Sequence, residues 1–315
     1  MEILHAAQEL KPAGRPVYAA IGVFDGVHLG HQRVIRQTLA DARDGQGLAV
    51  VVTFDRHPNA VVAPDRVPPS IYSLPQKLRT IAALGVDATW LIRFDEAFSR
   101  QTGPEFVRGL ARDFGRLHSV CVGAEFTFGH KRSGDVGLLR ELGRELGFAV
   151  HGMEAVTTDG LAVSSTRIRD AIRVGEIETA SQMLGRPYSL SGLVVRGDGL
   201  GRQLGFPTAN LETRGLVLPP SGVYVVRVLV HGQPHDAVLN IGFRPTLGSA
   251  VPPLQVEVHL PGFKGDLYGV ELEVTFLGKL RDERRFPSLE ALKAQIAQDI
   301  REARDRFGAS RAGEN

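Results

Sequence analysis

Short apolar runs alternate with amphipathic segments along the first half of the chain. The segments repeat apolar residues at helical spacing, as at Ile35, Leu39 and Ala42. Strands that alternate with helices predict a doubly wound parallel α/β sheet, Rossmann-like in architecture. Five runs rich in β-branched residues predict its buried strands, at residues 17–24, 48–54, 86–94, 119–126 and 148–156.

Local signals place two helix boundaries in this half. Thr102 and Glu105 have the spacing of a capping box, and Pro104 lies between them, so a helix is predicted to start here. Gly45 and Gly47 follow the first apolar face and predict the end of that helix.

The second half has short strands without helices between them. Gly/Pro-rich turns separate these runs, which predicts a small antiparallel β-barrel. A final helix is predicted to start at the cap Ser288, with an apolar stripe that continues to Phe307. The five predicted strands are residues 190–196, 223–230, 237–241, 254–260 and 270–276.

The change of pattern predicts two domains of different class. A helical stretch over residues 176–184 is followed by Gly185-Arg186-Pro187, which is typical of a link. We therefore predict one domain over residues 1–185 and a second over residues 186–315.

Bulk composition agrees with a soluble globular protein. The 315 residues are 43% hydrophobic and 23% charged, with a net charge of +2 that is too weak to indicate nucleic acid. A single cysteine, Cys121, excludes a disulfide framework. We expect no signal peptide and no membrane span, and so a cytoplasmic protein that is a monomer or a weak homo-oligomer.

The segment over residues 22–32 carries the strongest chemical signal. Gly22 and Gly26 let the backbone approach an anion, and a helix start supplies free N–H groups. His28 and His31 add donors that can hold phosphates while charge builds at one phosphorus. Two histidines at this spacing also suit zinc, with His57 as a third ligand, although structural zinc sites favour cysteine.

The histidine pair and its flanks resemble a known family. His28-Leu29-Gly30-His31 is similar to the His-x-Gly-His motif of nucleotidyltransferases, and Phe24-Asp25-Gly26 before it resembles the version in prokaryotic FAD synthetases. The resemblance implies that His28 and His31 are catalytic and that Gly22, Phe24, Asp25 and Gly26 bind ATP or flavin.

Three further strand ends carry residues that resemble this family. Read without it, His57 and Pro58 form a strand-end turn, and Ser164 and Ser165 cap a helix. The resemblance implies that Arg169, which follows Ser165, is catalytic. It implies that eight further residues at these strand ends bind ATP or flavin. Glu125 stands where the family has Asn or Asp. The implied binding residues at these strand ends are His57, Pro58, Gly123, Glu125, Phe128, Ser164, Ser165 and Thr166.

A glycine-rich stretch over residues 197–210 opens the predicted barrel. It lacks the Gly-Lys-Ser/Thr of a P-loop, and its glycines alone suit barrel turns. Its end, Pro207-Thr208-Ala209-Asn210, resembles the signature of riboflavin kinases, where Thr and Asn engage Mg²⁺ and ATP phosphates. The resemblance therefore implies that Thr208 and Asn210 are metal ligands. It also implies nucleotide or flavin binding by Gly197, Gly199, Gly201, Arg202, Gly205 and Pro207.

Later residues in the barrel extend the resemblance. Glu257 stands where riboflavin kinases have a catalytic carboxylate, although between Val256 and Val258 it also suits a solvated strand residue. Residues 240–246 and 280–286 match the same family, which implies binding roles for Asn240, Arg281 and Phe286.

Together the motifs resemble bifunctional riboflavin kinase/FAD synthetases. That resemblance implies an enzyme that converts riboflavin and ATP to FMN and ADP in the second domain. The first domain then converts FMN and ATP to FAD and pyrophosphate, and each step requires Mg²⁺. Alternatives are a nucleotidyltransferase with another acceptor fused to an inactive flavin-binding barrel, or a flavin-sensing or nucleic-acid-binding module. The absence of a basic patch disfavours nucleic acid.

Overall fold

The computed structural model describes residues 1–11, 14–243 and 254–312 and divides into two compact units. The first unit comprises Met1–Arg167 and Met183–Gly185. The second comprises Ile168–Gln182 and the chain from Arg186 onward. Residues 244–246, the end of one of the riboflavin kinase-like motifs, lie outside the described residues.

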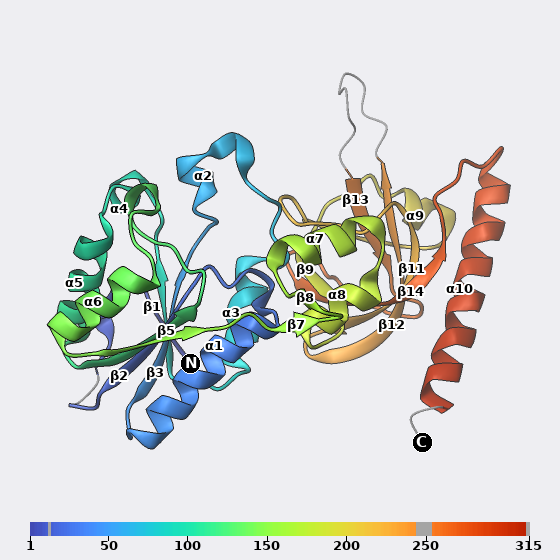
Figure 1. Ribbon diagram of the computed structural model, residues 1–315. Coiled ribbons are helices and arrows are strands. Elements are labelled where there is room, and N and C mark those ends of the chain that lie inside the picture. Colours follow the sequence, from blue (N-terminus) through green and yellow to red (C-terminus); the bar gives the residue numbers. More distant parts are fainter. Residues whose placement is uncertain (12–13, 244–253, 313–315) are drawn as a thin grey trace. The chain divides into compact units, whose positions relative to one another are not determined.

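The first unit contains the predicted parallel sheet (Figure 1). Every strand pair within this sheet is parallel, and the strand order is β1-β4-β3-β2-β5-β6. Four of the five predicted runs extend beyond the observed strands, because their last residues lie in the turns that follow the strands. The three-residue β1 carries too few positions to show a pattern. The strands are β1 (Glu2–Leu4), β2 (Val17–Ile21), β3 (Leu48–Phe54), β4 (Ala88–Ile92), β5 (Leu117–Gly123) and β6 (Ala149–Met153).

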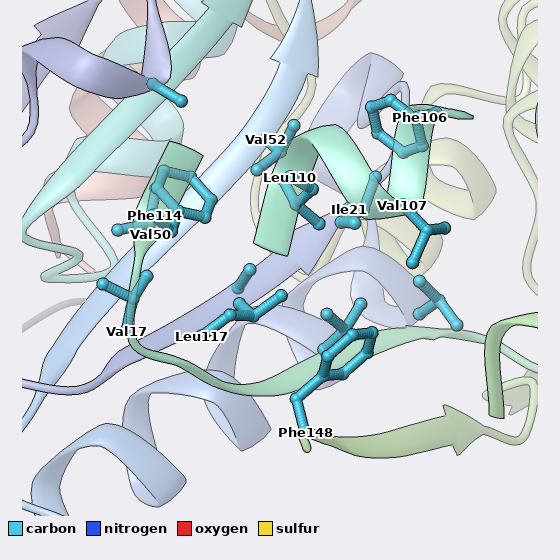
Figure 2. Packing of buried hydrophobic residues seen from close by; sticks show 14 of the residues in the cluster. Val17, Ile21, Val50, Val52, Phe106, Val107, Leu110, Phe114, Leu117 and Phe148 are labelled. Carbon is cyan, nitrogen blue, oxygen red and sulfur yellow. The ribbon is translucent and has the colours of Figure 1, made fainter. Parts of the chain in front are cut away.

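Helices cover both faces of this sheet, which confirms the doubly wound prediction. Leu110 and Phe114 of α5 pack against Val17 and Val50 of β2 and β3 (Figure 2). On the opposite face, Ile35 of α1 belongs to a separate buried cluster. The helices of this half are α1 (Leu29–Asp44), α2 (Asn59–Val62), α3 (Leu74–Ala82), α4 (Glu96–Ser99), α5 (Gly103–Phe114) and α6 (Val136–Leu146).

Shorter elements complete the first half of the chain. The predicted capping box opens α5, since Glu105 N–H donates to Thr102 Oγ1 and Thr102 N–H donates to the Glu105 carboxylate. The remaining elements up to Leu184 are η1 (Ala7–Glu9), η2 (Asp25–Val27), η3 (Pro64–Arg66), η4 (His130–Arg132), the hairpin β7 (Thr157–Thr158) and β8 (Leu161–Ala162), α7 (Ser165–Val174) and α8 (Ile177–Leu184).

The second unit contains the predicted antiparallel barrel, closed in the order β10-β13-β12-β11-β14-β9. The short β10 was not predicted, and the last strand continues to Arg281. From Arg186 onward its elements are β9 (Ser189–Val195), α9 (Leu200–Leu204), β10 (Ala209–Leu211), β11 (Gly222–Val230), β12 (Gln233–Phe243), β13 (Leu254–His259), β14 (Glu271–Arg281) and α10 (Leu289–Ala312).

Strand β11 is buried on both sides, which explains its continuous apolar run. Tyr224 faces the barrel interior, where its ring lies 5.3 Å from that of Phe276. Val225 faces the outside and packs against Ala303 and Phe307 of α10. The terminal helix therefore covers part of the barrel wall. Among the described residues, no helix combines the length and apolarity needed to cross a membrane.

Candidate active sites

The histidine pair lies where β2 ends and α1 begins. His28 is the N-cap of α1, and its Nδ1 accepts the backbone N–H of His31 at 3.4 Å. The two imidazoles stack, with ring centroids 3.5 Å apart. Because Nδ1 of His28 is the acceptor, a neutral His28 carries its proton on Nε2. Both rings thus stand at the positive end of a sixteen-residue helix.

We call residues 22–28 the signature loop, and its backbone is strained. Phe24 and Val27 have φ angles of 53° and 42°, a region that β-branched and bulky residues rarely occupy. Gly26, at φ 76°, lies so close to Ile71 that an added Cβ would be 3.0 Å from that side chain. Such backbone persists only where the surroundings hold it, and it is common at functional sites.

Hydrogen bonds from other segments hold the loop. The Asp25 carboxylate accepts the backbone N–H of Ile71 at 2.9 Å. Gln32 donates its side-chain amide to the Val27 carbonyl at 3.0 Å, and Ser165 donates its hydroxyl to the Asp25 carbonyl at 3.1 Å. The Ser165 contact brings the start of α7 to the signature loop. Gln32 is the last residue of the segment 22–32, and no sequence pattern assigned it a role.

A large cavity of 870 Å³ adjoins the same edge of the sheet. Ile21 and Val23 line it, as do His57, Pro58 and Phe128 among the predicted binding residues. Its lining is rich in aromatic rings and includes several basic side chains. These lining residues are Phe54, Phe94, Phe98, Phe106 and Phe126, with Arg100, His130, Lys131 and Arg132.

Charged groups at the end of β3 are firmly paired. Asp55 accepts the Phe94 N–H at 3.0 Å and two bonds from the Arg56 guanidinium. Burial alone would raise the pKa of Asp55, but the Arg56 and Phe94 hydrogen bonds outweigh it and lower that pKa. The carboxylate therefore stays ionised and bound to its neighbours.

Other predicted residues of the first domain lie outside that cavity wall. Ser164 caps α7 by accepting the Arg167 N–H at 3.2 Å, and Thr166 beside it is exposed. Gly123 ends β5, and Glu125 after it is exposed. Arg169 is buried and falls in the part of α7 grouped with the second unit.

The zinc interpretation finds no support in the geometry. Within residues 1–11, 14–243 and 254–312, no three His, Cys, Asp or Glu side chains lie together as a metal cluster. His57 instead accepts the Asn59 N–H on its Nδ1 at 3.1 Å.

In the second unit, strand register aligns the predicted kinase residues. Asn210 of β10 pairs with Glu257 of β13, which pairs with Asn240 of β12. The row continues through Val223 of β11 to Arg281 of β14. Val256 and Val258 are buried, so Glu257 points to the opposite, outer side of the barrel. All five members of the row line one cavity of 420 Å³.

The segment 198–208, which contains α9, and helix α10 also line this cavity. Gly199, Gly201 and Thr208 of that segment line it, as do Ile296 and Ile300 of α10. An added Cβ on Gly197 would come within 2.3 Å of the Asn210 amide, so the backbone approaches that side chain as only glycine allows.

Arg281 is fixed by a bidentate ion pair to helix α10. Its Nη2 and Nε lie 2.8 and 3.0 Å from the oxygens of Asp299, whose side chain is only 4% exposed. The guanidinium also lies 5.7 Å from the centre of the Phe286 ring, another residue of the cavity wall. This pair therefore joins β14 to α10 at the site.

Four predicted residues border this region without lining the cavity. Gly197, Arg202, Gly205 and Pro207 belong to the loop around it. The Pro207 carbonyl lies 2.8 Å from Nδ1 of His259, which does line the cavity. Because a carbonyl only accepts, that nitrogen carries the proton. The sequence analysis assigned no role to His259, although it lies two residues after Glu257.

Comparison with protein families finds two matches along the chain. The FAD synthetase family matches residues 10–167, and the riboflavin kinase family matches residues 184–307.

Curated relatives carry a single name that combines both activities. The chain is 40% identical over 292 residues to the bifunctional riboflavin kinase/FMN adenylyltransferase of Escherichia coli strain K12, covering 92% of this chain and 93% of that protein. The proteins of the same name from Pseudomonas fluorescens and Bacillus subtilis strain 168 are 38% and 33% identical. Those alignments cover 96% of this chain in both cases, with 97% and 96% of the relatives.

A solved structure is also similar. It is titled macrolide-efflux protein from Streptococcus pneumoniae, and it aligns with a TM-score of 0.80 and 29% identity over 96% of this chain and 98% of that one. The similarity extends over nearly the full length of both chains.

Proposed function

Because this chain belongs to the bifunctional riboflavin kinase/FMN adenylyltransferase family, we propose that each of its two sites carries one of the two reactions. The chain phosphorylates riboflavin to FMN and adenylylates FMN to FAD, with release of pyrophosphate. We assign the adenylyl transfer to residues 1–185 and the kinase reaction to residues 186–315.

The register row from Asn210 to Arg281 carries the kinase assignment. In our assignment, Glu257 accepts the proton of the ribityl 5′-hydroxyl as that oxygen attacks the γ-phosphorus of ATP, and ADP leaves. Asn240 and Arg281, on the same row, orient the flavin or nucleotide. Phe286 supplies an aromatic wall beside Arg281.

Thr208 and Asn210 are suited to hold Mg²⁺ at this site. Their hydroxyl and amide oxygens are neutral hard donors, which suit a cation whose charge is already balanced by phosphates. When bound, Mg²⁺ neutralises charge on the transferred phosphoryl group. The loop residues Gly197, Gly199, Gly201, Arg202, Gly205 and Pro207 then surround the nucleotide phosphates.

Adenylyl transfer at the first site needs no protein nucleophile. The FMN phosphate attacks the α-phosphorus of ATP in line, so the protein must align two anions and stabilise the charge that develops. We assign donation to these phosphates to His28 and His31 at the start of α1. Ser164, Ser165 and Thr166 add hydroxyls, and Arg169 neutralises charge.

We place the flavin ring in the aromatic cavity beside the signature loop. A volume of 870 Å³ and a wall of phenylalanines suit a flat tricyclic ligand. His57, Pro58 and Phe128 lie in that wall. The adjoining loop contains Gly22, Phe24, Asp25 and Gly26, which we assign to the same binding site. We also assign to it Gly123, the last residue of β5, and Glu125 after it.

A product time course tests the proposal. Purified protein is incubated with riboflavin and ATP, with and without Mg²⁺, and flavins are separated at intervals. We expect FMN to appear first and FAD to follow, with both absent in excess chelator. Appearance of FMN without FAD, when FMN is also supplied directly, would favour an adenylyl acceptor other than FMN.

We further propose that the enzyme works in the cytoplasm as a monomer or weak homo-oligomer, without nucleic acid or membrane. The weak net charge and the single cysteine support this. Light scattering of the purified protein, and a test of DNA binding at low salt, check it.

A further inference from the structure

A buried lysine outside every sequence motif lies against the signature loop. Lys77 belongs to α3 and is only 8% exposed. Its ammonium nitrogen lies 2.8 Å from the Phe54 carbonyl, 3.3 Å from Thr53 Oγ1 and 3.4 Å from the Val23 carbonyl. Val23 is in the signature loop, whereas Thr53 and Phe54 end β3. One side chain therefore joins the carboxyl ends of two neighbouring strands.

The hydrogen bonds of this group match an ammonium rather than an amine. An ammonium has three donors, and three oxygens receive them. Thr53 gives its own hydroxyl proton to the Val23 carbonyl at 3.0 Å, so its oxygen is left to accept from Lys77. A neutral amine has two N–H bonds, so one of these three oxygens would receive no hydrogen bond from Lys77.

The segment 71–77 holds the loop at two further points. Ile71 and Tyr72 donate their backbone N–H groups to Asp25, and the Ile71 side chain packs against Gly26. With Lys77, these contacts surround the strained residues Phe24 and Val27. The backbone that they hold leads directly into His28 and the start of α1.

Electrostatics give the ammonium a second effect. Burial lowers the pKa of Lys77 to about 8, and the charges of Asp25 and Asp55 oppose that shift. Those two carboxylates would otherwise repel the phosphates of ATP and FMN. A positive charge beside them offsets that repulsion.

We propose that Lys77 is a positioning residue for adenylyl transfer, which ties the ends of β2 and β3 together and maintains the strained loop that presents His28 and His31. This inference rests on the proposed function of the signature loop. Lys77 itself touches no reacting atom, and it acts through the backbone of residues 22–28.

The second activity of the chain supplies the control. K77M keeps most of the buried stem and removes the charge and donors, and K11M is a matched change at an exposed lysine of the same unit. For K77M we expect the kcat of FAD formation from FMN to fall about 100-fold, since misplacement of about 1 Å has that effect, with little change in KM. Riboflavin phosphorylation by K77M, and both activities of K11M, should match wild type.

A pH profile distinguishes positioning from a merely structural role. The wild-type kcat for FAD formation should fall as pH rises through about 8, whereas the kinase kcat should not. K77R stays protonated over this range, so its adenylyl transfer should not show the fall. This profile needs only wild type and K77R, and it remains decisive if K77M does not fold.

Three results would overturn the proposal. They are a wild-type kcat for FAD formation in folded K77M, an equal loss of both activities, or the same pH dependence in wild type and K77R. If wild type forms no FAD at all, the proposed function fails instead, and the two failures are thus distinguished.

Discussion

In the first unit the candidate site is built around a loop that follows a parallel strand, whereas in the second unit the central residues of the candidate site lie on the strands themselves. The signature loop needs φ angles of 53° and 42° at Phe24 and Val27 and hydrogen bonds from several other segments to hold its shape. The register row from Asn210 to Arg281 needs none of this, because antiparallel register aligns Asn210, Glu257 and Asn240.

This difference shows two ways to position groups for phosphate chemistry. A helix start offers N–H groups and a dipole for two polyanions, but only if a strained connection delivers it to the sheet edge. A barrel wall offers fixed side chains at regular spacing, and a covering helix then forms the cavity. The first arrangement depends on supporting contacts, and the second depends on strand pairing.

Replacing Glu257, the carboxylate of the row, should give the largest difference between the two activities. E257Q keeps the shape of the side chain and removes the general base, so we expect riboflavin kinase kcat to fall about 1,000-fold. FAD formation from added FMN should stay at the wild-type rate. Steady-state assays with each flavin measure both, and equal loss of the two activities would show that the sites are not separate.

The reciprocal change at the helix start should be somewhat smaller. H28A removes one donor to the phosphates, and loss of such a donor lowers kcat about 100-fold. The kinase activity of H28A is the control, since His28 lies in the other unit. Wild-type FAD formation in H28A would exclude the assigned role.

The ion pair between Arg281 of the register row and Asp299 of α10 tests the strand-and-helix arrangement. D299A leaves Arg281 without its partner, so we expect the free energy of unfolding of the second unit to fall by about 3 kcal/mol. Thermal denaturation followed by calorimetry reports this change. R281A is the matched comparison, and a larger loss in R281A would agree with Asp299 being the more deeply buried charge, because that variant leaves Asp299 without the guanidinium.

Titration of Lys77 should couple pH to the stability of the first unit. Its pKa in the folded state is about 8 against 10.5 for a free lysine, so the unfolded chain binds more protons between these values. The free energy of unfolding of wild type, relative to K77M, should therefore rise as pH increases from about 8 to 10.5. Denaturant titrations of both proteins across this range would contradict the assignment if the difference stayed constant.

The N-terminal cap of α5 should give the smallest effect, because Thr102 itself lines neither cavity. T102A removes the capping box of α5 and should lower the free energy of unfolding by about 1 kcal/mol. Both activities should keep their wild-type kcat. A change in only one kcat would show that α5 contributes to that site.

The sequence predicted elements better than it predicted contacts. Apolar runs located the parallel strands and the barrel, because burial alone determines those patterns. Strands β1 and β10 have three residues each, too few for a period to emerge. The runs ending at Phe24 and Phe126 were predicted too long, because residues of a tight turn are as apolar there as those of the strand.

Motifs likewise located the candidate sites without explaining how they are held. Glu257 alone suits a solvated strand residue, and only the pairing with Asn210 and Asn240 places it on a row across the barrel. Lys77 has no motif, since its role depends on oxygens more than twenty residues away in the chain. Such contacts arise from the fold and leave no local pattern.

Mixing two inactivated variants tests most directly the central claim that the two reactions occur at separate sites. E257Q and H28A are each incubated alone, and then together, with riboflavin and Mg-ATP, and FAD is measured. Our account predicts almost no FAD from either variant alone and efficient FAD formation from the mixture, because FMN made by H28A is adenylylated by E257Q. Failure of the mixture to form FAD, while E257Q alone still converts added FMN, would contradict free passage of FMN between sites. Loss of both activities in either variant would contradict their separation.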